Sequence, residues 1–337
     1  MSERITQRLM EVFNRKSPPE AEHYLRVLSR INKVLSQEEA EIRPYSSSGE
    51  PGGLVYLKHG IPTIIAPDIH ARMGFFLSIL FTTDDEGLSN MEKLASDELQ
   101  MVCVGDGFHS EGTLERWQSA FEEYKGLYKK HKHMDDEMRE SLGVMEMVME
   151  SKIAFPQNFH FLKGNHENIS NERGGGNFPF RKYAYEGPMV LDYIKKFYGD
   201  TFLERYYTFE KKLPLLTVGE NFLISHAEPA TYYDKETLIE YRENPEVVVG
   251  LTWTDNDDAE DGSVSKMLRG YLPNNKQEKS YYFGGHRPVS GLFNSRANGK
   301  YIQIHNPRKF VIAYIQADRD IDLDADIIEV EPFKLKG

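Results

Sequence analysis

The nine residues Phe159–Glu167, FHFLKGNHE, join a short apolar run to a polar turn. Such a run, closed by a glycine, is typical of a buried β-strand. The turn then presents the amide oxygen of Asn165 and the imidazole of His166, which suit metal binding and proton transfer. The stretch therefore predicts a layered protein of strands and helices, with its chemistry at a strand end.

The same arrangement recurs along the chain, because four further apolar runs end in polar residues. These endings are Asp68-Ile69-His70, Gly105-Asp106, Ser225-His226 and Gly285-His286. Together with Asn165, they supply Asp, His, Asp, Asn, His and His in chain order. Six oxygen and nitrogen donors on separate strand ends indicate a site for two metal ions, with one carboxylate left to bridge them.

The composition limits the partners and the compartment of the protein. With 337 residues and 39% hydrophobic content, the chain can bury one large core or two small ones. Its net charge of -12 argues against binding to nucleic acid or to an anionic membrane. Cys103 is the single cysteine, which excludes an internal disulfide. No apolar run reaches the roughly 20 residues that span a bilayer, and residues 1–10 lack a signal-peptide core, so we expect a cytoplasmic protein.

Three segments are expected along the chain. Residues 1–53 are predicted to form a helical N-terminal arm that packs on the rest of the protein through one apolar stripe: Tyr24, Leu28, Ile31 and Leu35. Residues 54–316 alternate short apolar runs with helical patterns, which predicts a catalytic domain of the α/β or α+β class. Residues 317–337 are rich in aspartate and are expected to form an acidic, solvated C-terminal tail.

Two helical patterns and one strand pair are expected inside the catalytic domain. The segment Leu114–Tyr128 and the methionine-rich stretch after it have apolar residues at helical spacing, and we expect the methionines to pack in the core. We place a helical insertion at about residues 113–138, close enough to Asp106 to act as a lid or substrate wall. The apolar runs at 301–304 and 310–315 are expected to pair as a closing hairpin.

The ordered motifs resemble those of the calcineurin-like metallophosphoesterase superfamily, and within it a divergent member of the phosphoprotein phosphatase (serine/threonine phosphatase) branch. That branch has GDxHG, GDxxDRG, GNHE and HGG motifs and a last histidine. The corresponding stretches here are residues 67–71, 105–106, 164–167, 225–228 and 285–287. Leu251–Asp255 also resembles the LWSDP element of the branch, so the likeness covers about residues 61–316. The resemblance implies a four-layer sandwich of two mixed β-sheets flanked by helices.

The resemblance also implies how the strand-end residues are used. Asp68 and His70 would hold the first metal, Asp106 would bridge, and the second metal would be held by Asn165, His226 and His286. The ions would be Mn²⁺, Fe or Zn²⁺. A hydroxide bridging the two ions would attack phosphorus, and His166 would protonate the leaving group as general acid. His305 falls outside the pattern and is expected to be structural.

The sequence departs from the family pattern after Asp106. The family has an aspartate that orients the acid histidine and an arginine that clamps phosphate, whereas this chain has His109 and Ser110. A neighbouring imidazole would lower the pKa of His166, and we hypothesise that Glu111 compensates for the missing aspartate. The candidates for phosphate binding are two guanidinium groups and one amide: Arg269, Arg72 and Asn165.

The predicted function is hydrolysis of phosphomonoesters at a dinuclear metal site, in the manner of a protein serine/threonine phosphatase. The altered loop keeps open a second class of enzyme, which acts on small-molecule phosphates, nucleotides or phosphodiesters. A third alternative is a catalytically weakened, metal-binding regulatory protein. The expected partner is a phosphorylated substrate, and a regulatory partner is compatible with the sequence. The sequence does not determine the metal, the physiological substrate or the oligomeric state.

Overall fold

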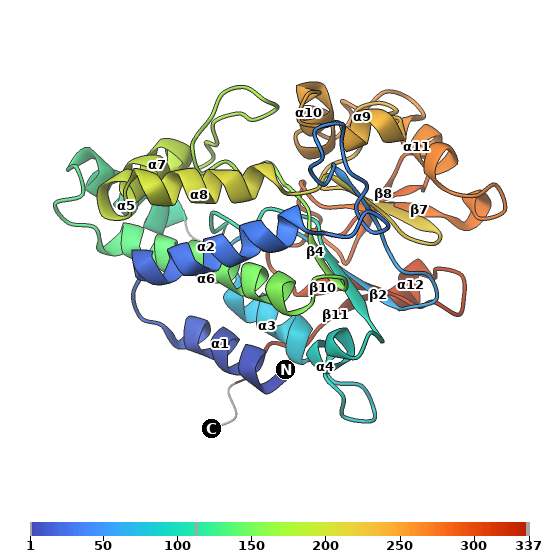
Figure 1. The fold of residues 1–337 in the computed structure, drawn as a ribbon, viewed down its shortest axis with the longest axis horizontal. Coiled ribbons are helices and arrows are strands. Elements are labelled where there is room, and N and C mark those ends of the chain that lie inside the picture. Colours follow the sequence, from blue (N-terminus) through green and yellow to red (C-terminus); the bar gives the residue numbers. More distant parts are fainter. Residues whose placement is uncertain (1, 112–113, 335–337) are drawn as a thin grey trace.

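The computed structural model describes residues 2–111 and 114–334, which form two β-sheets and the helices around them (Figure 1). The strands are β1 (Leu54–Tyr56), β2 (Thr63–Ala66), β3 (Gln100–Cys103), β4 (Phe159–Phe161), β5 (Leu216–Val218), β6 (Phe222–Ile224), β7 (Tyr281–Gly284), β8 (Asn294–Arg296), β9 (Tyr301–Gln303), β10 (Val311–Ile315) and β11 (Ile327–Glu329). The helices are α1 (Ser2–Asn14), α2 (Ala21–Ser36), α3 (Met73–Phe81), α4 (Asn90–Ala95), α5 (Leu114–Lys125), α6 (Lys132–Ala154), α7 (Glu186–Phe197), α8 (Asp200–Lys211), α9 (Lys235–Ile239), α10 (Pro245–Thr252), α11 (Ser263–Tyr271) and α12 (Leu323–Asp326), with a 3-10 turn at Gln277–Lys279.

Both sheets are mixed. One has the strand order β1-β5-β6-β7-β9-β8, and the other has the order β11-β10-β2-β3-β4. In the second sheet β2, β3 and β4 run parallel to one another, as do β6, β7 and β9 in the first. Parallel strands end at the same edge of a sheet, so three strands of each sheet deliver their following loops to one place.

Three apolar clusters separate four layers of secondary structure. On the five-stranded sheet, Ile64 and Met101 pack against the helices that precede β5. Their strand neighbours Ile65 and Val102 pack against the six-stranded sheet. This division follows from the two-residue period of a strand, which sends successive side chains to opposite faces. A further cluster joins the outer face of the six-stranded sheet to α9, α10 and α11. The predicted four-layer sandwich is therefore confirmed.

The N-terminal helices pack against α6, where Figure 1 shows α1 and α2 beside it. The predicted stripe is buried in this interface: Tyr24, Leu28, Ile31 and Leu35. Ion pairs fasten its polar rim, because Arg15 contacts Glu146 at 2.6 Å while Arg8 and Arg30 contact Glu150 at 2.6 and 2.8 Å. The arm is thus part of the packed structure, as its apolar stripe predicted.

The helix of the predicted insertion, α5, lies against α6 and α7. The first residue of that prediction, 113, lies outside the described residues. On α6 the methionine stripe is fully buried, which confirms core packing: Met134, Met138, Met145 and Met149. Among the described residues, no helix is long and apolar enough to cross a membrane.

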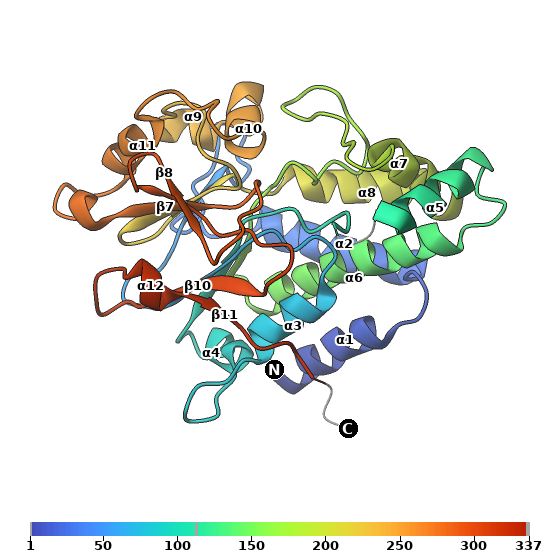
Figure 2. The same ribbon diagram turned by 180° about the vertical axis from the view of Figure 1, so that it is seen from behind.

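Two segments near the C-terminus differ from the expectations. β9 and β10 do not form a hairpin, because β9 pairs with β7 and β8 while β10 pairs with β2 and β11 in the other sheet. The chain crosses between the sheets after β9. The stretch predicted as an acidic tail supplies β11, which pairs with β10 (Figure 2). Ile327 in this strand and Val330 just after it are buried. These two apolar side chains give the aspartate-rich segment a place in the sheet.

Candidate metal centre

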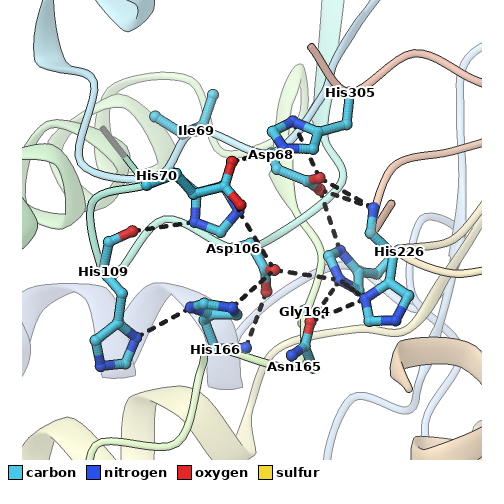
Figure 3. A network of polar contacts seen from close by, with 12 residues as sticks. Asp68, Ile69, His70, Asp106, His109, Gly164, Asn165, His166, His226 and His305 are labelled. Atoms are coloured by element: carbon cyan, nitrogen blue, oxygen red, sulfur yellow. Dashed lines mark hydrogen bonds and ion pairs between the residues drawn. The ribbon is translucent and has the colours of Figure 1, made fainter. Parts of the chain in front are cut away.

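The loops after β2, β3, β4, β6 and β7 bring the predicted metal ligands and the predicted acid into one cluster (Figure 3). A further side chain, from the loop after β9, joins them. The members are Asp68, His70, Asp106, Asn165, His166, His226, His286 and His305, and we call them the strand-end cluster. All are buried except His286, which is partly exposed.

Two glycines allow these loops to approach one another closely. A Cβ atom on Gly164 would lie 2.2 Å from Asp106 Oδ1, and one on Gly285 would lie 2.3 Å from Asp68 Oδ1. Any larger residue at either position would displace a candidate ligand. Asp106 and His286 themselves have positive φ angles of 50° and 63°, which non-glycine residues seldom adopt. Such backbone strain is concentrated at functional sites, where surrounding contacts hold it in place.

Glu167, the last residue of the GNHE turn, fastens two of the loops together. Its carboxylate accepts hydrogen bonds from the backbone N–H groups of Gly164, Asp106 and Gly107 at 2.7, 2.9 and 2.9 Å. The side chain is fully buried, so these bonds replace the water that a carboxylate would otherwise hold. Glu167 therefore sets the distance between the β3 loop and the β4 loop.

One half of the strand-end cluster has the geometry of a metal cage. His226 Nδ1 lies 3.1 Å from the carbonyl oxygen of Val104, so this nitrogen carries the proton and Nε2 is left as an acceptor. Nε2 nevertheless faces Asn165 Oδ1 at 2.9 Å, His286 Nδ1 at 3.2 Å and Asp106 Oδ2 at 3.4 Å. Ligands about 2.0–2.2 Å from one ion lie about 3.0–3.5 Å apart. The four atoms thus fit the second metal that the sequence predicted.

The other half contains a residue that the sequence analysis assigned to structure alone. His70 Nδ1 lies 3.1 Å from the carbonyl oxygen of His109, which leaves Nε2 as an acceptor, 3.8 Å from Asp106 Oδ2. His305 Nδ1 is buried, lies 3.2 Å from Asp68 Oδ2 and has no hydrogen-bond partner in the part of the chain that the structure describes. Asp68, His70 and His305 offer ligand atoms close enough for a single ion. The missed signal was that His305 follows β9 just as the other members follow their strands.

The predicted acid, His166, lies at the edge of the cluster between an imidazole and a phenyl ring. Its Nε2 is 3.6 Å from Asp106 Oδ2, and its Nδ1 is 3.0 Å from Nδ1 of His109, which takes the place of the family aspartate. The ring of Phe180 covers it, with centroids 3.7 Å apart. Burial, and after it the charges of His70 and His109, hold the pKa of His166 well below its usual value.

Burial raises the pKa of the two aspartates in the cluster. The pKa of Asp68 is raised to about 6 by burial, with Glu111 adding to the effect. The pKa of Asp106 is raised well above its usual value by burial and then by the charges of Glu167 and Asp68. Carboxylates crowded in this way favour a cation between them, since a bound dication reverses the local repulsion.

Of the two proposed phosphate-binding arginines, one is engaged by the backbone and the other is exposed on a helix. Arg72 donates to four backbone carbonyl groups, those of Asp68, Ile69, Asn306 and Lys309, at 2.7 to 3.3 Å. Arg269 is exposed near the end of α11. In the part of the chain that the structure describes, no hydrogen bond or ion pair joins Arg269 to the strand-end cluster. The structure brings Asn165 into the cluster but does not direct these two arginines into it.

Glu111 does not contact the predicted acid. Its carboxylate accepts from His305 Nε2 at 2.8 Å and from Lys182 Nζ at 2.5 Å, and it lies 3.6 Å from His70 Nε2. Burial opposes ionisation of Glu111, but the charge of His70 and the bond from His305 outweigh it and lower the pKa of the carboxyl group. His109 has a positive φ of 62°, and the loop beyond it directs Glu111 toward the first metal position instead of toward His166.

No protein-family model and no curated protein matches the sequence. Solved structures do match. A protein serine/threonine phosphatase from Saccharomyces cerevisiae, described as similar to human phosphatase PP5, is 15% identical, with 94% of this chain and 91% of that chain covered and a TM-score of 0.55. A mutant of a cold-active protein tyrosine phosphatase is 13% identical over 83% of this chain and 82% of that chain, with a TM-score of 0.49. A putative diadenosine tetraphosphatase is 15% identical over 84% and 99%, with a TM-score of 0.42. The first of these likenesses, together with the layers described above, shows that the chain has the calcineurin-like fold that the sequence predicted.

Proposed function

We propose that this protein is a dinuclear-metal phosphoesterase that hydrolyses phosphomonoesters in the manner of a protein serine/threonine phosphatase. The observation that carries the proposal is that hydrogen-bond acceptor atoms of the strand-end cluster lie close together. His226 Nε2 lies 2.9 Å from Asn165 Oδ1 and 3.4 Å from Asp106 Oδ2, and because Nδ1 of His226 bonds to Val104, Nε2 has no proton for either oxygen. A cation removes that repulsion.

The residues fit two ions that share Asp106. The second ion would be held by Asp106, Asn165, His226 and His286, and the first by Asp106, Asp68, His70 and His305. Bound divalent ions supply Lewis-acid stabilisation of phosphate and lower the pKa of water. Mixed carboxylate, amide and imidazole donors suit manganese, iron or zinc. The neighbouring main-chain carbonyls of Val104 and His109 fix the imidazole tautomers that such binding requires.

His166 would hold the proton for the leaving group. Its Nε2 faces the cluster, while Nδ1 is paired with His109 Nδ1. The lowered pKa leaves the ring neutral before substrate binds. A phosphate dianion beside it favours the charged form, so the substrate would itself raise the pKa of its acid. Nδ1 of His109 can either accept a hydrogen bond from Nδ1 of His166 or donate one to it.

A second candidate is an esterase for small phosphates, nucleotides or diesters. It is favoured by the loss of the arginine clamp, because Ser110 replaces that arginine and donates to Glu137 at 2.8 Å. Arg116 forms ion pairs with the same Glu137 carboxylate and with Glu140. A phosphoprotein site that lacks a bidentate arginine has to recognise phosphate through other groups.

The test is hydrolysis of a phosphothreonine peptide and of a matched phosphodiester by the manganese-loaded protein and by Asp106→Asn. We expect turnover of the peptide and a loss of at least about a hundredfold in kcat for the variant, together with fewer bound ions per chain. Asp85→Asn is the matched control, because Asp85 is exposed and outside the cluster. Metal content is measured on every sample.

The other outcomes identify the alternatives. Preference for the diester, with the same sensitivity to Asp106→Asn, selects the second candidate. Stoichiometric metal without turnover of either substrate selects the regulatory, metal-binding interpretation. Failure of the wild-type protein to bind metal contradicts the proposal itself.

A further inference from the structure

A lysine outside the strand-end cluster reaches it through one carboxylate. Lys182 Nζ lies 2.5 Å from Glu111 Oε1, and the same oxygen lies 3.6 Å from His70 Nε2. The second oxygen of Glu111 accepts from His305. A carboxylate carries the charge and the oxygen geometry of one edge of a phosphate group. Glu111 therefore marks a place where a phosphate oxygen would meet both the first metal position and an ammonium group.

We propose that Lys182 binds the substrate phosphate, and that Glu111 occupies the ammonium group of Lys182 only until that phosphate arrives. The inference rests on the proposed function, since it assigns a residue to the same site. It supplies the cation that the sequence lacks at Ser110. No covalent bond is made or broken in this exchange, because a phosphate oxygen only replaces the Glu111 carboxylate as the anionic partner of Lys182.

Three other cations that could play this role are already engaged, and among the described residues Arg269 has no hydrogen bond or ion pair with the strand-end cluster. Arg72 donates to backbone carbonyls, Arg116 pairs with Glu137 and Glu140, and Arg287 pairs with Asp255 at 2.6 Å. Lys182 differs from them in its partner, because within residues 2–111 and 114–334 its one ion pair is with Glu111, which lies beside His70. Its side chain is also 39% exposed, so an incoming anion can reach it.

The backbone around Lys182 is held firmly enough to direct the side chain. The N–H groups of Lys182 and Ala184 donate to the buried carboxylate of Glu186 at 3.0 and 3.1 Å. The hydroxyl group of Tyr183 donates to the carbonyl oxygen of Glu111 at 3.1 Å, which joins the lysine segment to the loop after β3. Lys182 also lines an open groove between this segment and α5. Its ammonium group therefore lies between the solvent-exposed groove and Glu111.

The charges favour the exchange. A phosphomonoester carries up to two negative charges and more acceptor oxygens than a carboxylate, so Lys182 binds it more strongly than it binds Glu111 at equal geometry. Lysine also binds as a point charge on a flexible stem, which allows it to follow a phosphate whose position is set by metal ions. Glu111 keeps its bond to His305 after Lys182 leaves.

The test measures inorganic phosphate binding to the manganese-loaded protein by calorimetry, which does not depend on turnover. Lys182→Met is expected to weaken phosphate binding roughly ten- to hundredfold, and Lys182→Arg to restore most of it. Arg181→Met is the matched control, because Arg181 is exposed and its guanidinium stacks on Tyr185. Its phosphate affinity should stay within about twofold of the wild type. Metal stoichiometry should be equal in all four proteins.

Kinetics separate this inference from the proposed function. If the wild type hydrolyses a phosphopeptide, Lys182→Met should raise KM more than it lowers kcat. Phosphate binding that is lost in Lys182→Met, in a protein without turnover, would support Lys182 and contradict the function. Equal phosphate affinity in Lys182→Met and the wild type, or no phosphate binding by the wild type, would overturn the role of Lys182.

Discussion

Two of the buried groups of ionisable side chains in this protein differ in how completely they are paired. Behind α6, the side chains of Glu38, Arg43, Lys152 and His160 form what we call the arm cluster. Glu38 contacts Arg43 and Lys152 at 2.6 Å each, and Arg43 also donates to the carbonyl oxygen of Gly52 at 2.6 Å. Each buried cation there faces a carboxylate or a carbonyl group.

The strand-end cluster has the opposite character. Acceptor atoms of His226, Asn165 and Asp106 face one another in it, and two buried nitrogen atoms, His286 Nε2 and His305 Nδ1, have no hydrogen-bond partner among the described residues. Apart from the partly exposed His286, the members of both clusters are buried, so burial alone does not distinguish a structural network from a functional site. The balance of donors and acceptors does, because an unbalanced cluster is stable only when an ion or a substrate completes it.

The largest test of this comparison is Glu38→Ala in the arm cluster. It leaves the charges of Arg43 and Lys152 buried without their carboxylate, so we expect a loss of about 3–5 kcal/mol in the free energy of unfolding. Metal binding should be unchanged. Urea unfolding followed by metal titration of the folded protein checks both values. A variant that keeps its stability would show that the arm cluster is not a paired network in solution.

A smaller test uses pH, because the two clusters should respond with opposite signs. The pKa of Asp68 is raised to about 6 by burial, so its contribution to stability is present below its usual value of 3.8 and is lost as pH rises through 6. Burial acts to raise the pKa of Glu38, but Lys152 and Arg43 lower it to about 2. Its contribution is present above its usual value of 4.5 and is lost as pH falls toward 2.

The measurement is the melting temperature of metal-free protein from pH 4 to 7, for the wild type and for Asp68→Asn. The wild type should lose stability relative to the variant as pH rises through this range. Saturating metal should abolish the difference in slope, since a bound cation favours the ionised carboxylate. Parallel curves for the two metal-free proteins would contradict the raised pKa of Asp68.

The smallest expected effect belongs to a cation outside both clusters. Arg269→Ala should change kcat/KM by less than about twofold, because Arg269 is exposed on α11 and surface substitutions seldom exceed about 0.5 kcal/mol. Steady-state kinetics on a phosphopeptide decides the point. A loss of tenfold or more would mean that α11 approaches the site when substrate binds, and would restore Arg269 as a phosphate ligand.

Much of the fold could be predicted because its signals are local. Apolar runs of three to five residues ended in polar turns at Asp68, Asp106 and Asn165, and parallel strands must bring such turns to one edge. The buried stripe of α2 was legible from its helical spacing. The glycines at 164 and 285 were part of the motifs, and their reason emerged only with the close contacts that they permit.

The remaining features depend on which strands pair, and that is not a local property. The runs at 301–304 and 310–315 looked like partners because they are close in sequence, but they belong to different sheets. This division places His305 beside Asp68. The direction of the Glu111 side chain could not be predicted either, because a positive φ at His109 turns the loop just before Glu111. Spacing cannot reveal such a turn for a residue other than glycine.

The division of the cluster between two sheets has a mechanical consequence. Asp68, Asp106 and Asn165 extend from the five-stranded sheet, whereas His226, His286 and His305 extend from the six-stranded one. Any ion held by residues from both groups is a cross-link between the two halves of the sandwich, set at one end of their apolar interface. Removing the ions by chelation would then loosen the contact between the two sheets as well as take away the chemistry that the ions supply. Amide exchange in β7 and β9 should quicken when the ions are removed, and the sheets should part first at the edge where substrate enters.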